Sequence, residues 1–138
     1  MNVIHPFIGH FEGQGTWYDA AGKSQAYRVS QTLSASDDGF ELAFRHDFDD
    51  GDHTDAMMQM RWIAPHLFAL EMNAVPVGHG YVFGDTLHYH LLVGGKVVEA
   101  AYRDVGEGEL VVLGSSSSNT EGNFIAWRET LEHKKGHS

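Results

Sequence analysis

Glycines alternate with large side chains near the start of this 138-residue chain, within residues 7–18. Read with the two-residue period of a β-strand, Phe11, Gly13, Gly15 and Trp17 share one face. Strand interiors normally avoid glycine, so glycines repeated on one face indicate a close approach of another backbone or a sharp bend. A sheet needs such bends before its edges can meet. The segment therefore predicts the first, strongly coiled strand of a small closed barrel.

The rest of the chain continues as short alternating segments separated by turns. The alternation is most regular over residues 40–48, and Asp38-Gly39 and Gly94-Gly95 have the composition of tight hairpin turns. We expect further strands over residues 25–35, 40–48, 55–62, 68–72, 77–83, 86–93, 97–103, 109–116 and 122–131. Because no segment has a helical period, the sequence predicts an all-β fold, a single antiparallel up-and-down β-barrel of about eight to ten strands. A two-sheet sandwich is the alternative.

The length and composition predict a single soluble domain. We expect the barrel to span residues 1–132, and the polar residues 133–138 to form a C-terminal tail. The formal net charge of −10 argues against nucleic acid or an anionic membrane as a partner, because both require basic patches. The chain has no cysteine, which excludes disulfides and thiolate chemistry. It also has no signal-like start and no apolar run long enough to span a membrane, so we expect a cytoplasmic protein.

The start of the chain resembles a known superfamily. Residues 7–15 resemble the opening of calycin-type barrels, a Gly-x-Trp followed by alternating glycines, with Phe11 at the tryptophan position. Nitrobindin-like and other lipocalin-like domains share this start. Residues 15–18 also resemble the lipocalin Gly-x-Trp-Tyr signature, which implies that Arg128 packs across Trp17. The resemblance implies a barrel that holds haem, a fatty acid or another apolar molecule, or one with isomerase or decarboxylase activity.

A ligand site is expected where polar side chains share a face with the large apolar residues that line the barrel. We expect ligand-binding side chains at Phe44, His46, Met58, Met60, Trp62, His79, Tyr81 and Tyr89. Histidine and tyrosine are also common as half-buried, hydrogen-bonded residues, and methionine is ordinary core filler. A purely structural role for these residues is therefore the alternative.

The pair His88 and His90 is the strongest metal-like pattern in the chain. Two histidines at this spacing lie on one face of a strand and could share a metal with a third ligand. They alternate with Leu87, Tyr89 and Leu91, which are expected to face the interior. The pattern therefore predicts a solvated pair, and we predict no metal site.

Haem is the cofactor that the resemblance brings into consideration. Inside the barrel, His46 or His79 could reach the iron. In nitrobindin-like proteins the axial histidine lies late in the chain, where this sequence has His133 and His137. Haem binding stays open as an alternative function.

An enzyme is the other alternative. An isomerase or lyase could use His46 or His79 as a general base and Tyr81 or Tyr89 as a proton donor. No nucleophile elbow, phosphate loop or paired-carboxylate motif accompanies these residues, so we assign no catalytic residue. We favour a non-enzymatic barrel that binds a small apolar or amphipathic molecule. A homodimer is compatible with the sequence, although nothing in it locates an interface.

Overall fold

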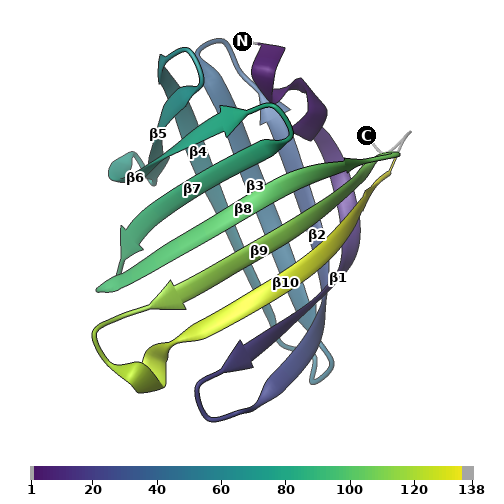
Figure 1. The fold of residues 1–138 in the computed structure, drawn as a ribbon, viewed down its shortest axis with the longest axis vertical. Helices are drawn as coiled ribbons and strands as arrows, with labels where there is room; N and C mark the ends of the chain where they lie inside the picture. Colours follow the sequence, from purple (N-terminus) through teal and green to yellow (C-terminus); the bar gives the residue numbers. More distant parts are fainter. Residues whose placement is uncertain (1, 135–138) are drawn as a thin grey trace.

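The computed structural model describes residues 2–134. It is a closed barrel of ten antiparallel strands, in which consecutive strands pair and β1 pairs with β10 (Figure 1). The strands are β1 (Gly9–Asp19), β2 (Ser24–Ala35), β3 (Gly39–Phe48), β4 (His53–Ala64), β5 (Leu67–Met72), β6 (Val75–Phe83), β7 (Thr86–Val93), β8 (Lys96–Gly106), β9 (Glu109–Ser117) and β10 (Ile125–His133). The prediction of an all-β, up-and-down barrel is confirmed.

Strand β1 comes close to its neighbours at the positions of its alternate glycines. A Cβ atom added to Gly13 would overlap the carbonyl oxygen of Thr130 in β10. A Cβ atom added to Gly15 would lie 2.6 Å from Tyr27 Cζ and 2.7 Å from Glu129 Cγ. Gly13 therefore allows the strands that close the barrel to approach, and Gly15 leaves space for two side chains inside it.

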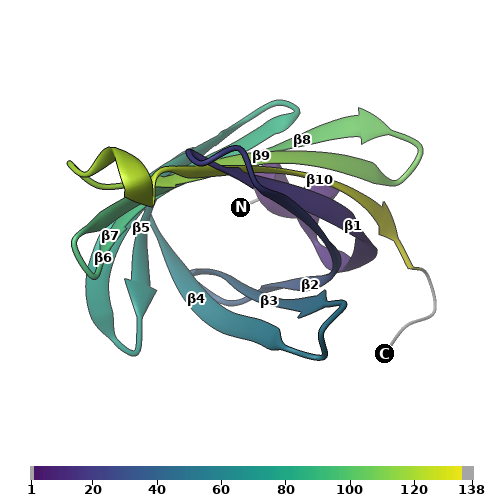
Figure 2. The same ribbon diagram turned by 90° about the horizontal axis from the view of Figure 1, so that it is seen from below.

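The two ends of the barrel are built differently. A short 3-10 helix, η1 (Asn2–Phe7), covers one end and buries Ile4 and Phe7. Below it the barrel is filled by large side chains, among them Phe11, Leu33, Phe40, Leu42, Met60, Phe68, Leu70, Leu87, Leu110 and Leu131. The hairpins that join β1 to β2 and β3 to β4 lie at the opposite end, from which Figure 2 views the barrel. The sequence predicted no helix over residues 2–7, so only the structure shows that η1 closes this end of the barrel.

The inward and outward faces of β6 are the reverse of those predicted. Val82 is fully buried, whereas His79 and Tyr81 are exposed on the outer face. On the inner face, a Cβ atom added to Gly80 would overlap the ring of Phe68. The expectation that His79 and Tyr81 point into the barrel is wrong, because β6 turns a glycine toward the space that Phe68 occupies.

The expectation that Arg128 packs across Trp17 is also wrong. Trp17 faces the interior, and the residue paired with Arg128 is its neighbour Thr16. Successive residues of a strand point to opposite faces, so Arg128 lies exposed on the outer face of β10. The lipocalin-type closure by this arginine is therefore absent at this position.

The C-terminal strand extends slightly beyond the expected barrel limit. Strand β10 ends at His133, and a further 3-10 turn, η2 (Glu121–Asn123), precedes it. Of the predicted polar tail, residues 135–138 lie outside the described part of the chain. Among residues 2–134, no helix has the length and apolar character needed to cross a membrane.

Candidate functional site

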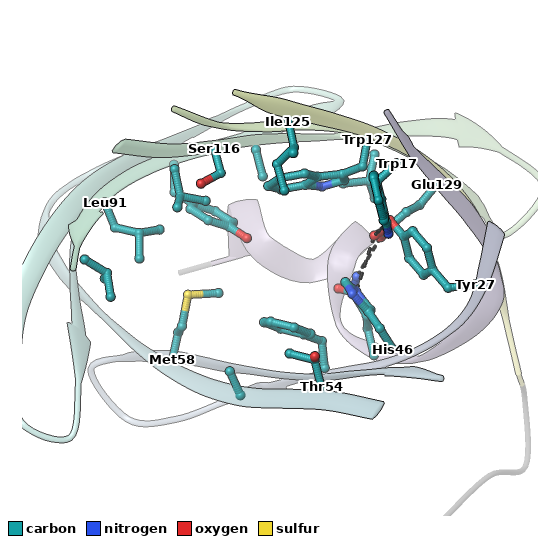
Figure 3. Close-up of a pocket in the computed structure, with 18 of the residues that line it drawn as sticks. Trp17, Tyr27, His46, Thr54, Met58, Leu91, Ser116, Ile125, Trp127 and Glu129 are labelled. Carbon is teal, nitrogen blue, oxygen red and sulfur yellow. Dashed lines mark hydrogen bonds and ion pairs between the residues drawn. The ribbon is translucent and has the colours of Figure 1, made fainter. Parts of the chain in front are cut away.

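A cavity of about 390 Å³ occupies the barrel at the end opposite η1. Within the described chain, every strand except β6 contributes to its wall. Much of this wall is apolar or aromatic, including Trp17, Phe44, Phe48, Met58, Leu91 and Trp127 (Figure 3). Clefts of this size and character are typical small-molecule sites in proteins.

Among residues 2–134, one carboxyl side chain lies on this wall. Glu129, from β10, is only 2% exposed. The Tyr27 hydroxyl donates a hydrogen bond of 2.7 Å to Glu129 Oε2, and the Gln31 amide donates one of 3.1 Å to Oε1. Tyr102 donates to Gln31 Oε1 at 2.6 Å, which orients that amide toward the carboxyl group. Buried carboxyl groups require such partners. Here both direct donors come from β2, and Tyr102 from β8 supports one of them, Gln31.

The imidazole of His46, from β3, completes the arrangement. Its Nε2 atom lies 3.3 Å from Glu129 Oε2, and the two side chains point toward each other (Figure 3). Its ring contacts those of Tyr27 and Phe44, with centroids 4.6 and 4.9 Å apart. The His46 side chain is 19% exposed, more than that of Glu129. We refer to Tyr27, Gln31, His46, Tyr102 and Glu129 as the polar cluster.

Burial shifts the pKa values of Glu129 and His46 in opposite directions. Removal from water disfavours the carboxylate and raises the pKa of Glu129 from 4.5 to about 7, although the hydrogen bonds from Tyr27 and Gln31 oppose the shift. Burial likewise disfavours the imidazolium and lowers the pKa of His46 from 6.5 to about 4, against the opposing charge of Asp47. Near pH 6 the pair is therefore neutral, with its proton on the carboxyl group. Above pH 7 the carboxylate is available to accept a hydrogen bond or to pair with a cation.

The predicted ligand-binding residues fall into three groups. The structure places one group on the cavity wall, namely Phe44, His46, Met58 and Tyr89. Met60 and Trp62 belong to the filled half of the barrel, where the Trp62 ring packs against Phe40 and Phe68. His79 and Tyr81 lie outside the barrel, as described above.

Neither the carboxyl nor the amide group of the polar cluster was among the site residues predicted from the sequence. Glu129 shares the inward face of β10 with the buried Leu131. Gln31 similarly lies between Val29 and Leu33 on the inward face of β2. A charged or amide side chain in the apolar phase of an alternating strand was the available signal, because such residues are rarely buried without a partner.

The histidine pair considered for a metal lies on the outer surface. His88 and His90 alternate with buried residues of β7, and the His88 ring stacks on Tyr81 with centroids 4.9 Å apart. Over residues 2–134, no group of three or more His, Cys, Asp or Glu side chains is placed to hold a metal ion.

A haem held by His133 does not fit this cavity. His133 contacts Phe11 at the end covered by η1, and it is not part of the cavity wall. His137 lies outside the described residues. The histidine that the structure does place on the wall is His46, whose Nε2 atom faces Glu129.

Tyr27→Phe is expected to lower the free energy of unfolding by about 1–3 kcal/mol, because it removes a donor from a buried carboxyl oxygen. Urea denaturation at pH 8, where Glu129 is ionised in the folded protein, measures the effect. Tyr18→Phe is the matched control, since Tyr18 is 56% exposed on the outside of β1; we expect a change within about 0.5 kcal/mol. Equal losses in the two variants would contradict the role given to the Tyr27 hydroxyl.

Comparison with known proteins supports the fold. No family model matches the chain, and no curated protein matches it. The S-type phycobiliprotein lyase CPES from Guillardia theta is similar in structure, with a TM-score of 0.75 and 10% identity over 97% of this chain and 92% of that one. Rv2717c from M. tuberculosis has a TM-score of 0.70 and 14% identity, over 98% and 99% of the two chains. A redesigned barrel, mFAP1, has a TM-score of 0.53 and 14% identity, over 96% and 100%. At these identities the likeness establishes the barrel fold alone.

Proposed function

We propose that this protein binds a small apolar or amphipathic molecule inside its barrel. The observation that carries the proposal is the cavity of about 390 Å³, with an apolar wall and one polar cluster. The other half of the same barrel is filled by η1 and large side chains, so the hollow is confined to one end. A cavity confined in this way, with a hydrogen-bonded polar cluster on its wall, has the features of a binding site.

The similar structures support binding at a general level. One is a phycobiliprotein lyase, and the redesigned barrel was solved bound to DFHBI. These likenesses support a barrel that accommodates a ligand and do not select the ligand. The strand order and the glycine-rich start also lead us to propose a lipocalin-like member of the calycin superfamily.

Native mass spectrometry and a visible absorption spectrum of freshly purified protein test the proposal directly. A co-purified mass without a Soret band supports a carrier-type cavity and gives the class of the ligand. A Soret band would instead identify haem and overturn the preference for a haem-free carrier. A protein without bound mass is then titrated with the uncharged fluorophore N-phenylnaphthylamine, whose emission rises in apolar surroundings.

Ala100→Phe is expected to weaken the binding of N-phenylnaphthylamine by about tenfold or more. Ala100 lies on the cavity wall, and a phenyl group there takes up space that the ligand needs. Ala101→Phe is the matched control, because the next residue of β8 points to the opposite face and does not line the cavity. Fluorescence titration measures both dissociation constants. Equal affinities in the two variants, or no binding to the wild-type protein, would contradict binding in this cavity.

A further inference from the structure

We propose that the ligand of this cavity is an organic cation, an amphipathic amine or amidine whose charged group pairs with Glu129 and whose apolar body lies against the aromatic wall. The inference rests on the proposed binding function and names the class of molecule that is bound. It follows from the balance of charge around Glu129, from the nature of its neighbours and from the shape of the wall.

Among the described residues, the cavity wall carries the acidic side chain of Glu129 but no lysine or arginine. The nearest arginines by register face outward: Arg128 adjoins Glu129 on the exposed face of β10, and Arg28 adjoins Tyr27 on the exposed face of β2. Buried carboxylates are normally matched by a positive charge, because an isolated buried charge is costly. A cationic ligand would supply the charge that the protein itself does not.

The polar side chains that contact Glu129 or interact with it electrostatically are uncharged at neutral pH. From β2, β3, β7 and β8 these are Tyr27, Gln31, His46, Tyr89 and Tyr102. Burial raises the pKa of each tyrosine, and it lowers the pKa of His46 to about 4. On β1, the residue paired with Glu129 is Gly15, which has no side chain. The neighbours therefore orient the carboxyl group by hydrogen bonds without neutralising it.

The wall beside this carboxyl group is aromatic. Trp17 and Trp127 lie on the same side of the cavity as Glu129 (Figure 3). Trp127 lies against Gly114, where an added Cβ atom would overlap the indole ring, so the glycine makes room for the ring along the wall. Indole faces attract organic cations through their ring electrons, and they also provide apolar contact area. A fatty acid would instead bring a second negative charge to a wall whose described residues include no lysine or arginine to pair with it.

Ionisation of the carboxyl group couples this binding to pH. Burial raises the pKa of Glu129 to about 7, so below that value a cation must displace a proton in order to pair with the carboxylate. We expect the affinity for an ammonium ligand to rise by about tenfold from pH 6 to pH 8. An uncharged ligand of the same shape should show no such rise.

Calorimetric titration with three probes of one shape tests the inference: naphthylethylamine, naphthylethanol and naphthylacetate. At pH 8 the ammonium probe is expected to bind the wild-type protein about tenfold to a hundredfold more tightly than the alcohol, and the anion is expected to bind most weakly. Glu129→Gln should abolish the preference for the ammonium probe over the alcohol, and it should leave the affinity for the alcohol unchanged. Glu132→Gln is the matched control, because Glu132 is an exposed acid on the same strand; it should keep the preference.

Several results would overturn the inference. These are ammonium and alcohol affinities within twofold of each other, tightest binding of the anion, a preference that survives in Glu129→Gln, or an ammonium affinity that does not change with pH. The pH series needs no variant, so it remains decisive if Glu129→Gln fails to fold. N-phenylnaphthylamine separates this inference from the proposed function. If it binds while the charged and uncharged probes do not differ, the cation is excluded and the binding cavity stands; if no probe binds, both are excluded.

Discussion

In the His46→Gln variant, the free energy of unfolding is expected to fall by about 3 kcal/mol as the pH rises from 4.5 to 7. In this variant Glu129 is the remaining titrating member of the pair, and burial raises its pKa from 4.5 to about 7. The folded state thus favours the protonated carboxyl group. Its contribution to stability is complete below pH 4.5 and is lost as the pH rises through 7.

In the wild-type protein, the His46–Glu129 pair is expected to contribute almost no change of the free energy of unfolding with pH over most of this range. The pKa of His46 shifts in the opposite direction, from 6.5 to about 4, so its contribution is present above pH 6.5 and is lost as the pH falls through 4. Between pH 4.5 and 6.5 the unfolded chain holds one proton on His46, and the folded protein holds one on Glu129. Because the pair binds the same number of protons in both states, it contributes no pH dependence to stability there.

Urea denaturation across this pH range measures the slopes. Glu129→Gln should give the opposite trend to His46→Gln, with stability that rises from pH 4.5 to 6.5, because His46 then titrates without its counterpart. His53→Gln, which removes a histidine with 49% exposure on β4, should follow the wild-type curve. Parallel curves for His46→Gln and the wild-type protein would refute the coupled pair, whatever their vertical offset.

Gly13→Ala is expected to lower the free energy of unfolding by about 3 kcal/mol. The added methyl group would overlap the Thr130 carbonyl oxygen, and a backbone atom cannot move aside as the end of a side chain can. The strands β1 and β10, which close the barrel, would have to separate at this point. Urea or thermal unfolding followed by circular dichroism measures the loss.

Gly122→Ala is the matched control for this substitution. Gly122 lies in η2, and a Cβ atom added there meets nothing within 4 Å. We expect the free energy of unfolding of the Gly122→Ala variant to stay within about 0.5 kcal/mol of the wild-type value. If Gly13→Ala were as stable as Gly122→Ala, the close contact of β1 with β10 would be excluded.

The amino-acid sequence by itself determined the strands, their closure into a barrel and the coiled start. Residues 40–48 alternate regularly and form β3 within one residue of the predicted limits. The alternation persists because one face of each strand is buried, and a shift by one residue would expose every apolar side chain. Gly13 and Gly15 were informative for a related reason, since a glycine within a strand costs stability unless something else needs the space.

The reach of η1 into the barrel was decided only by the tertiary structure. Met58 and Met60 share the inward face of β4, yet Met58 lines the cavity and Met60 lies in the filled half. Their local patterns do not differ. The difference arises because Ile4 and Phe7 enter from one end, and nothing in the pattern of β4 records the position of that plug.

The closure of the barrel also determines that the side chains of the polar cluster meet. Glu129 and His46 come from β10 and β3, which do not pair, and their contact spans most of the chain. Periodicity assigns a side chain to a face of its own strand, but the curvature of the closed sheet determines which faces meet inside. The sequence could therefore place His46 inside the barrel, whereas only the tertiary structure could bring Glu129 to it at a buried position where the pKa values of both groups shift.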